Sequence, residues 1–345
     1  MQSSPSLFER FQAHVMGVLT EPFDPNERLF ALYLASSLIF AFGIYLAAER
    51  KGVLKEKTFL QFLFPRHVWQ HPSAWLDLRY FFFHKFIGHF LVVILGTGLS
   101  VTVYQWLTGQ EEVILNAIRD PIPKTDEIFA IVSFLIVATI VVDFVSFFSH
   151  YLQHKIPVLW QFHKVHHSAE VMHPVSNFRE HPVDNLLYML AHSLTSGLLM
   201  AGATTVFGFV PSAPAILGVS IVGLLFNVSG YHLRHSHIWL RWPGKLSMIF
   251  PSPAHHHVHH SCHPDHIDKN FAFMFPVWDV IFKTYHMPED NRDVKFGIGS
   301  ENEGELTSCL RLYYIPFRDT YRLLRRTKDG SKSSSEAQPQ VTPAE

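Results

Sequence analysis

Long uncharged stretches alternate with polar segments along the first half of the chain. Leu29 to Ala48 contains no charged residue, and its length matches the ~20 residues that an α-helix needs to cross the bilayer core. Phe81 to Leu107 and Ile128 to Phe148 are also mostly apolar. The pattern predicts three transmembrane helices in this half.

A further apolar region follows at Asn185 to Phe209 and Ala213 to Val228. The two stretches are joined by Val210-Pro211-Ser212, a short turn signal. We expect a helical hairpin that enters and leaves the membrane on the same side. The predicted fold class is therefore an all-α integral membrane protein with four to five transmembrane helices.

Charge between the spans predicts their orientation. Glu49 to Arg79 carries six Lys or Arg against three acids, whereas Thr108 to Glu127 carries two against five. Basic loops stay on the cytoplasmic side, so Ile128 to Phe148 should return there and place His150 at the cytoplasmic surface.

We expect five segments along the chain. The first is an N-terminal lead-in (1–28) with a helix near Leu7 to Leu19, and the second is a transmembrane part with its cytoplasmic loop (29–149). The others are a histidine-rich region with the hairpin 185–228 (150–288), a peripheral segment (289–330) and a disordered tail (331–345).

Composition narrows the classes of partner and site. Net charge is -1, so the chain lacks the broad basic field of a nucleic-acid-binding protein. Cys262 and Cys309 are the only cysteines, too few for a thiolate metal site. Any metal would therefore be held by nitrogen and oxygen.

Histidine is concentrated in one region, because 19 of the 24 lie between His150 and His286. Three groups have regular spacing: His150-x3-His154, His163-x2-His166-His167, and the run His255 to His260, which contains the same HxxHH spacing at His256, His259 and His260. Residues three and four apart share one face of a helix. One such group alone also fits polar contacts at a membrane boundary or a metal-storage run. Repetition on one predicted membrane face favours a metal site.

Imidazole suits Zn, Cu, Fe and Ni, and eight histidines exceed the three or four ligands that one such ion takes. The pattern therefore implies two ions. Because only neutral imidazole binds, metal affinity should fall below about pH 6 to 6.5. Nearby acids are candidates for orienting the rings, although each also fits a solvated acid or a helix cap: Asp143, Glu170, Glu180, Asp184, Asp265 and Asp268.

At this point the sequence resembles the sterol desaturase and fatty acid hydroxylase superfamily. Beyond the three histidine groups, the matching pieces are Arg179-Glu-His181-Pro182, Leu233-Arg-His235-Ser-His237, Asp268-Lys-Asn270-Phe271 and Trp278-Asp279. They cover His150 to Tyr285 in family order. The bacterial sterol-desaturase-like members and the alkylglycerol monooxygenase branch are the most similar.

The resemblance implies four transmembrane helices capped by a cytosolic dimetal site. The implied ligands are His150, His154, His163, His166, His167, His235, His256, His259 and His260. Further metal ligands, or residues that hold the ligands in place, are His181, His232, His237, His257, Asp268 and Asn270. The cofactors implied are two iron ions, or zinc in the protein as purified, with O2 as co-substrate.

Two positions depart from the family pattern. Asn270-Phe271-Ala272 stands where Asn-Tyr/Phe-Gly is frequent, and Lys283 replaces the glycine of a Trp-Asp-x-x-Phe-Gly-Thr run. Both lie beyond the implied ligands, so they concern the substrate channel more than the metal site.

The function implied is O2-dependent hydroxylation or desaturation of a sterol, fatty acyl or ether lipid at the cytoplasmic face of a bacterial inner membrane or the endoplasmic reticulum. An electron donor such as cytochrome b5 or ferredoxin would be needed. The basic stretches Arg50 to Lys57 and Arg322 to Lys328 could dock an acidic donor. The same charges also suit membrane topology and anionic headgroups.

Two other classes remain as alternatives. A membrane metal transporter or sensor would place its ligands near the bilayer midplane, whereas these histidine groups follow the spans. A zinc-dependent membrane hydrolase needs an open metal position and a general base, and the chain has no HExxH motif.

Overall fold

Helices dominate this computed structural model, which describes residues 6–96, 98–110, 127–211, 215–216, 219–290, 294–299 and 303–328. The longer helices are α1 (Leu7–Thr20), α2 (Ala31–Arg50), α5 (Pro72–Phe83), α7 (Leu99–Thr108), α9 (Ile128–Lys155), α10 (Pro157–His167), α11 (Pro182–Phe207) and α16 (Cys309–Lys328). Shorter ones are α3 (Phe59–Leu63), α4 (Arg66–Trp69), α6 (Phe90–Gly96), α12 (Ile221–Val228), α13 (Leu246–Ile249), α14 (Pro253–His259) and α15 (Val277–Phe282).

Other short elements connect these helices. A π-helix, η2 (His84–His89), joins α5 to α6, and the 3-10 helices are η1 (Glu21–Phe23), η4 (Pro174–Phe178), η5 (Tyr231–His235), η6 (Pro264–His266) and η7 (Glu303–Glu305). Strands β1 (Ala215–Ile216) and β2 (Val219–Ser220) form one antiparallel pair. Most of the predicted far-side loop, 111–126, and the predicted tail, 331–345, lie outside the described residues.

Four described segments are long and apolar enough to cross a membrane: Ala31–Arg50, Pro72–Thr108, Ile128–Lys155 and Pro182–Phe207. They overlap the three predicted spans and the first arm of the predicted hairpin. The all-α membrane fold class is thus confirmed, with four candidate spans within the described ranges. The orientation of the spans stays a prediction.

The second arm of the hairpin differs from the prediction. Instead of a helix over Ala213 to Val228, the described residues form β1, β2 and the eight-residue helix α12. Ser220 caps α12 because its side chain accepts the N–H of Gly223, which fixes the start of the helix there. Eight helical residues reach only about 12 Å, so α12 is too short to cross a bilayer of ~30 Å.

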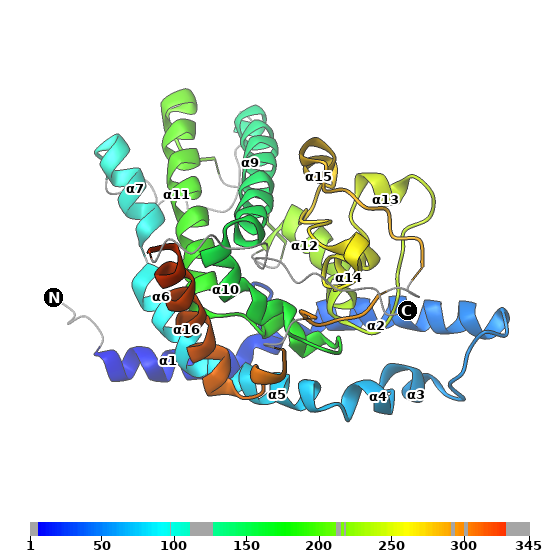
Figure 1. Cartoon of the computed structure of the whole chain (residues 1–345). Coiled ribbons are helices and arrows are strands. Elements are labelled where there is room, and N and C mark those ends of the chain that lie inside the picture. The colour runs from blue at the N-terminus through cyan, green and yellow to red at the C-terminus, as the bar shows by residue number, and fades with distance from the viewer. Residues whose placement is uncertain are drawn as a thin grey trace.

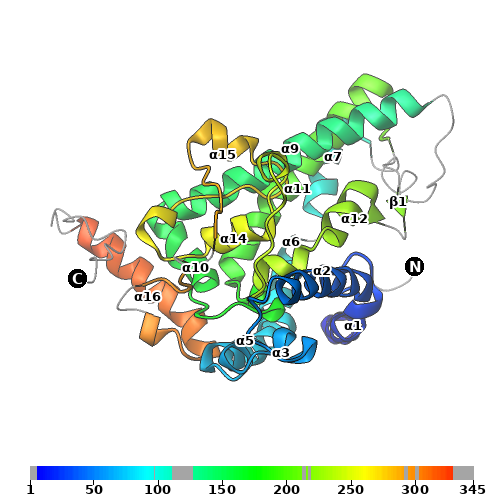
Figure 2. The same cartoon turned by 90° about the vertical axis from the view of Figure 1, so that its right-hand side faces the viewer.

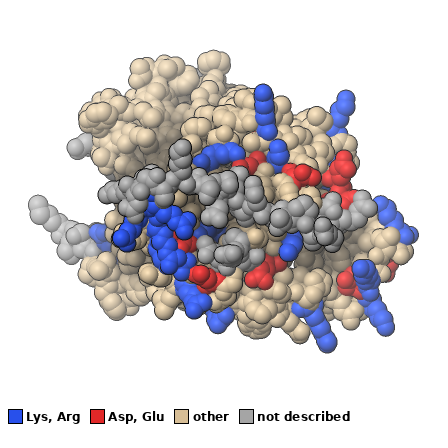
Figure 3. All heavy atoms as spheres, in the orientation of Figure 1, with Lys and Arg blue, Asp and Glu red and all other residues tan. Residues whose placement is uncertain are grey.

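Helix α11 packs between α7 and α9, and the three run side by side (Figure 1). Gly197 permits the close approach of α11 to α7, because a Cβ there would lie 2.7 Å from the carbonyl oxygen of Ser100. The outward faces carry exposed apolar side chains such as Ile136 and Leu194. Figure 3 shows no charged side chains at the end where α7, α11 and α9 project, which suits contact with lipid.

Helix α2 runs across the base of this bundle and packs mainly against η5, α12 and α3 (Figures 1 and 2). Its buried residues Tyr33, Ser37, Ala41 and Tyr45 recur every four positions, so they lie on one face of the helix. Other faces expose Ile39 and other apolar residues. This helix therefore supports the histidine-rich region from one side while presenting an apolar surface outward.

Helix α10 is fixed between the bundle and α16, which packs on it through Leu312 and Ile315. The buried amine of Lys164 lies 2.7 Å from Asp319 of α16. At the other end of the chain, α1 leads to Arg28, whose guanidinium binds Glu180 at 2.9 Å. Both terminal regions therefore brace the segment that carries the central histidines.

Candidate metal centre

The first two histidines lie on the last turns of α9, beyond the apolar part of the span. His150 and His154 are one turn apart, and their ring centroids are 5.2 Å from each other. The carbonyl oxygen of Phe271 accepts a hydrogen bond of 3.1 Å from Nδ1 of His150. This contact fixes the ring orientation and leaves Nε2 for another partner.

Helices α10 and α14 carry the HxxHH motifs. Helix α10 begins with Pro157 at its first position, directly after the end of α9, and proline favours such a start because its missing N–H is not needed there. Helix α14 begins in the same way with Pro253, after the N-cap Ser252. Each motif thus lies on a helix whose start is fixed by its own sequence.

Nine histidines converge into two groups whose ligand atoms lie within 4.8 Å of one another in each group. The five-histidine group contains His150, His154, His163, His167 and His259, and the four-histidine group contains His166, His235, His256 and His260. These are the nine residues that the family resemblance implies as ligands. The structure brings them together, while metal ligation itself stays a prediction.

The two motif helices exchange histidines between the groups. On α10, His163 and His167 face the five-histidine group while His166 faces the other. On α14 and its C-cap residue His260 the assignment is reversed, since His256 and His260 lie in the four-histidine group and His259 in the other. The groups are neighbours, because the stacked rings of His167 and His260 have centroids 4.4 Å apart.

Hydrogen bonds at Nδ1 orient several of these rings. Asp184 lies 3.0 Å from Nδ1 of His163, Asp268 lies 3.4 Å from Nδ1 of His154, and the carbonyl oxygen of Lys269 accepts from Nδ1 of His259 at 2.9 Å. Ser176 Oγ lies 3.3 Å from Nδ1 of His235. Such partners fix the tautomer and turn the opposite nitrogen toward a metal.

The opposite nitrogens fit a metal. Within the described ranges, Nε2 of His163, Nε2 of His259, Nδ1 of His166 and Nδ1 of His260 are buried without a hydrogen-bond partner. Burying a polar atom without a partner costs about 1–3 kcal/mol, so a cation held by His163 and His259 in the five-histidine group would offset a real penalty. An all-imidazole donor set suits iron, copper, nickel or zinc, and five rings in one group exceed the tetrahedral preference of zinc.

Burial keeps the imidazoles neutral. It lowers the pKa of His163 to about 3 and that of His166 to about 4. The pKa values of His167, His259 and His260 are also well below the ordinary 6.5, again chiefly because burial disfavours the charged form. Neutral imidazole is the form that binds a metal.

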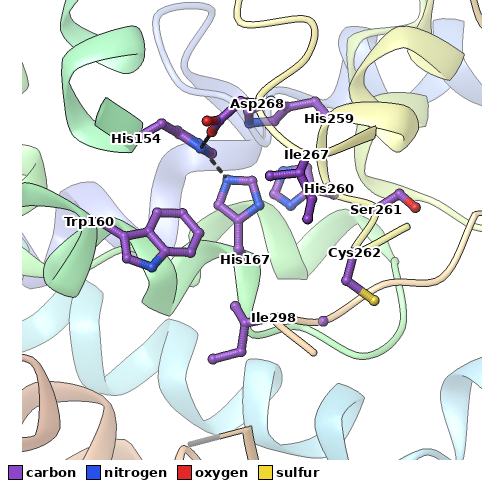
Figure 4. Close-up of a pocket in the computed structure, with 11 residues that line it drawn as sticks. His154, Trp160, His167, His259, His260, Ser261, Cys262, Ile267, Asp268 and Ile298 are labelled. Atoms are coloured by element: carbon purple, nitrogen blue, oxygen red, sulfur yellow. Dashed lines mark hydrogen bonds and ion pairs between the residues drawn. The ribbon is translucent and has the colours of Figure 1, made fainter. Parts of the chain in front are cut away.

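A pocket opens onto both groups. Its lining includes His154, His167, His259 and His260, together with Trp160 and Asp268. Figure 4 shows His154 between Asp268 and His167, whose Nε2 atom lies 3.1 Å from Nε2 of His154. The pocket therefore gives small molecules a way to the place where the rings meet.

The six further candidates lie outside both groups. His181 caps α11 by accepting the N–H of Val183 at Nδ1, and His232 is buried in η5. His237 and His257 donate from Nε2 to the carbonyl oxygens of Phe62 and Leu233. Asn270 forms hydrogen bonds with the main chain at His255 and His286. Of these six candidates, Asp268 is the one that contacts a member of a histidine group, His154.

Some of the six candidate acids contact a histidine of the two groups and the others bind elsewhere. Asp184 and Asp268 contact group histidines, as described above. Asp143 accepts main-chain N–H groups of Met274 and Phe275, and Glu180 pairs with Arg28. Glu170 lies near His71, and Asp265 donates its N–H to Nδ1 of His263.

Sequence reasoning missed the buried connection between Asp77 and the segment that follows α10. Asp77 pairs with Arg179 and, at 3.0 Å, with Nε2 of His173. Arg179 also donates to the carbonyl oxygens of Ser168 and Ser73. The motif Arg179-Glu-His181-Pro182 marked the arginine, but no local signal paired it with an acid about a hundred residues away.

Comparisons with known proteins match the part of the chain that carries both histidine groups. Residues 135–284 match the family model for fatty acid hydroxylase. Human alkylglycerol monooxygenase is 30% identical over 158 residues, which are 46% of this chain and 31% of the human protein. The Danio rerio alkylglycerol monooxygenase is 30% identical over 175 residues, 50% of this chain and 35% of that protein.

A bacterial relative is the ornithine lipid hydroxylase of Rhizobium tropici, which is 25% identical over 164 residues, 48% of this chain and 45% of that enzyme. The matches thus span less than half the length of these three relatives. No solved structure is significantly similar to this chain. Four apolar helices and relatives that act on lipids indicate an integral membrane protein. Residues 135–284 thus match a fatty acid hydroxylase domain, and the relatives are consistent with the sterol desaturase and fatty acid hydroxylase superfamily.

Proposed function

We propose that this protein is a membrane di-iron oxygenase that hydroxylates or desaturates a lipid, using O2 and electrons from an external donor. The observation that carries the proposal is the pair of adjacent all-histidine groups at the end of an apolar helix bundle. The relatives, named for lipid hydroxylation and alkylglycerol monooxygenation, support a lipid substrate.

The five-histidine group would hold one iron and the four-histidine group the other. When bound, the two ions supply activation of O2 and attack on an unactivated C–H bond. The nine proposed ligands come from α9, α10, η5 and α14. The chemistry would therefore take place at a fixed position relative to the bundle.

The side chains around the groups orient the ligands and exclude water. Asp184 and Asp268 hold His163 and His154 by their Nδ1 atoms. Phe271 is buried, and its ring centroid lies 4.9 Å from that of His154 and 5.5 Å from that of His259. A dry apolar wall strengthens electrostatic interactions inside the site and protects reactive species from solvent.

The surface of α16 suits an acidic electron donor. Arg318, Arg322, Arg325 and Arg326 line one hollow on this helix. Opposite charges steer two proteins together and fix their relative orientation. A cytochrome b5 or a ferredoxin docked there would face the same side as the basic loops, which we assign to the cytoplasm by the positive-inside rule.

Metal analysis combined with O2 uptake tests the proposal. We expect two irons per chain in protein purified in detergent, and O2 consumption coupled to lipid oxidation after reduction. Tightly bound, redox-silent zinc in an active sample would overturn the oxidative mechanism.

Single ligand variants test the residue assignment. His167→Ala and His259→Ala should each abolish turnover while membrane insertion is unchanged. His67→Ala is the matched control, because His67 is exposed on α4 away from both groups and should retain activity. Full activity in either ligand variant would contradict the ligand set.

A further inference from the structure

An apolar cavity of about 530 Å³ is lined in part by Tyr231 and Arg234 of η5, the element that also carries His235 of the four-histidine group. Its walls come from α12, α13 and the chain around Phe275, with Leu225, Phe226 and Trp242 among the lining residues. A volume of this size suits a lipid chain. Nearly all lining side chains are apolar or aromatic, and Arg234 is the one charged residue in the wall.

The mouth of the cavity lies on an apolar surface. Leu246 and Phe250 line the cavity and are 42% and 47% exposed, and the neighbouring Met248 and Ile249 of α13 are more than half exposed. Large apolar side chains grouped on a membrane protein surface indicate contact with lipid. A bilayer lipid can therefore enter here without crossing water.

Arg234 is a buried residue in the wall of this cavity. Its side chain is buried, and its guanidinium carbon lies 4.6 Å from the ring centroid of Phe226 and 5.5 Å from that of Phe273. Its hydrogen bond goes to the carbonyl oxygen of Phe273 at 2.8 Å. Asp143 interacts with it electrostatically, but no carboxylate within the described ranges is within ion-pair distance of it. A guanidinium remains charged at any physiological pH and has five N–H donors. The N–H donors that do not bind Phe273 can therefore bind a ligand.

The same arginine connects the cavity to the metal groups. Arg234 also lines a smaller pocket together with His255 and His256, and His256 belongs to the four-histidine group. It is also the sequence neighbour of His235, another member of that group. A ligand group held by Arg234 would therefore lie at the metal end of the cavity, with its apolar chain extending toward α13.

We infer that the cavity binds a bilayer lipid with an anionic headgroup, whose phosphate or carboxylate oxygens are held by Arg234. The carbon presented to the metal groups is then close to the headgroup and not at the far end of the chain. Burial strengthens such a charged hydrogen bond, and charge complementarity selects against neutral lipids of the same length. This second statement rests on the proposed function, whereas the binding statement does not.

Binding to metal-free protein tests the inference without turnover. Trp242 lines the cavity, so ligand binding should change its fluorescence. The probes are a lysophosphatidate, the corresponding free fatty acid and the corresponding neutral alkylglycerol, all with the same chain. We expect at least one of the two anionic lipids to bind about tenfold or more tightly than the neutral one, and their order tells phosphate from carboxylate.

Variants of the arginine separate its charge from its structural contacts. Arg234→Gln should remove the preference for anionic lipid, and Arg234→Lys, which keeps the charge, should retain most of it. Arg66→Gln removes one charge from the exposed surface of α4 and should leave the preference unchanged. Circular dichroism and gel filtration identify any variant that fails to fold. If Arg234→Gln fails to fold, the lysine variant and the comparison of lipids in wild type test the inference.

Several outcomes overturn the inference. Equal binding of anionic and neutral lipids to wild type, no binding of any of them, or an undiminished preference in folded Arg234→Gln would each do so. In iron-loaded enzyme, product mass spectrometry should locate the oxidised carbon near the headgroup, and oxidation at the far end of the chain would contradict the second statement. Anionic preference without any oxidation would leave the binding inference standing while the proposed function fails.

Discussion

Asp184 is the carboxylate placed closest to a group histidine, with Oδ2 at 3.0 Å from Nδ1 of His163. Its other oxygen accepts from the amide of Gln153, so the carboxylate is held at both ends. Asp268 is farther from its histidine and also binds the amine of Lys155. The two acids therefore differ in how firmly they fix a ring.

Asp184→Asn should weaken metal binding. The amide keeps the shape but loses the charge that makes His163 a stronger ligand, and replacing such a partner typically lowers metal affinity by about 10- to 100-fold. Competition with a chelator, read by metal analysis, measures the change. Glu170→Gln is the matched control, because Glu170 contacts His71 and no group histidine; equal metal affinity in both variants would show that Asp184 does not support the site.

Lys283 is the family departure that the backbone explains. It follows the last residue of α15 with φ at 61° and ψ at 30°, in the left-handed region. Glycine is common at this position because it has no Cβ to be strained. Sequence comparison with the family marked the position, and the structure shows that the constraint is on the backbone.

Lys283→Gly should stabilise the protein by about 1 kcal/mol, since a non-glycine residue in this region is strained by about that amount. Thermal unfolding in detergent measures the effect as a rise in Tm. Lys283→Ala keeps the Cβ and removes the rest of the side chain, so it should leave Tm nearly unchanged. A lower Tm in the glycine variant would show that the lysine side chain makes a stabilising contact.

At the scale of elements, the pair Asp77–Arg179 holds the segment between α10 and α11 against α5. Both side chains are almost fully buried, and Arg179 also binds main-chain oxygens on both sides. Removing one member leaves the other charged and buried without compensation. The pair therefore fixes where α10 lies relative to the bundle.

Asp77→Asn should destabilise the protein by about 3–5 kcal/mol, the range found when one partner of a buried ion pair is removed. Glu305→Gln is the control, because Glu305 is partly exposed in its pair with Arg318 and an exposed pair contributes less than about 1 kcal/mol. Unfolding in detergent compares the two. A similar small loss in both would show that the interior pair is solvated.

Elements formed by local spacing could be predicted, whereas elements that depend on distant partners could not. The apolar lengths predicted α2, α9 and α11, and the HxxHH spacings predicted that His163 and His167 share a helical face. The division of His166 and His259 between the two groups depends on how α10 and α14 pack. Likewise, the course of α2 across the bundle depends on η5 and α12, and no periodicity encodes that contact.

For the whole molecule, buried neutral histidines make stability depend on pH. Burial lowers the pKa of His255 to about 3 and those of His181 and His257 to about 4, although none of them belongs to the histidine groups. Between pH 6.5 and about 4 the unfolded chain binds more protons at these sites than the folded protein. Stability is therefore fully present above pH 6.5 and declines as pH falls.

The metal-free protein should lose up to about 1.4 kcal/mol per pH unit for each such histidine below pH 6.5. Unfolding in detergent at a series of pH values measures the slope. His181→Asn keeps a good N-cap for α11 but removes one titrating group, so it should make the slope shallower. An identical slope in wild type and variant would show that His181 does not contribute.

The exchange of histidines between α10 and α14 would affect how the protein gains and loses the two proposed iron ions. With two ions bound as proposed, each motif helix is clamped at both ions, so withdrawing either ion loosens rings that coordinate the other. Chelation should then strip both ions in one cooperative step. When iron is scarce, most molecules would hold either both ions or neither, and few would hold one.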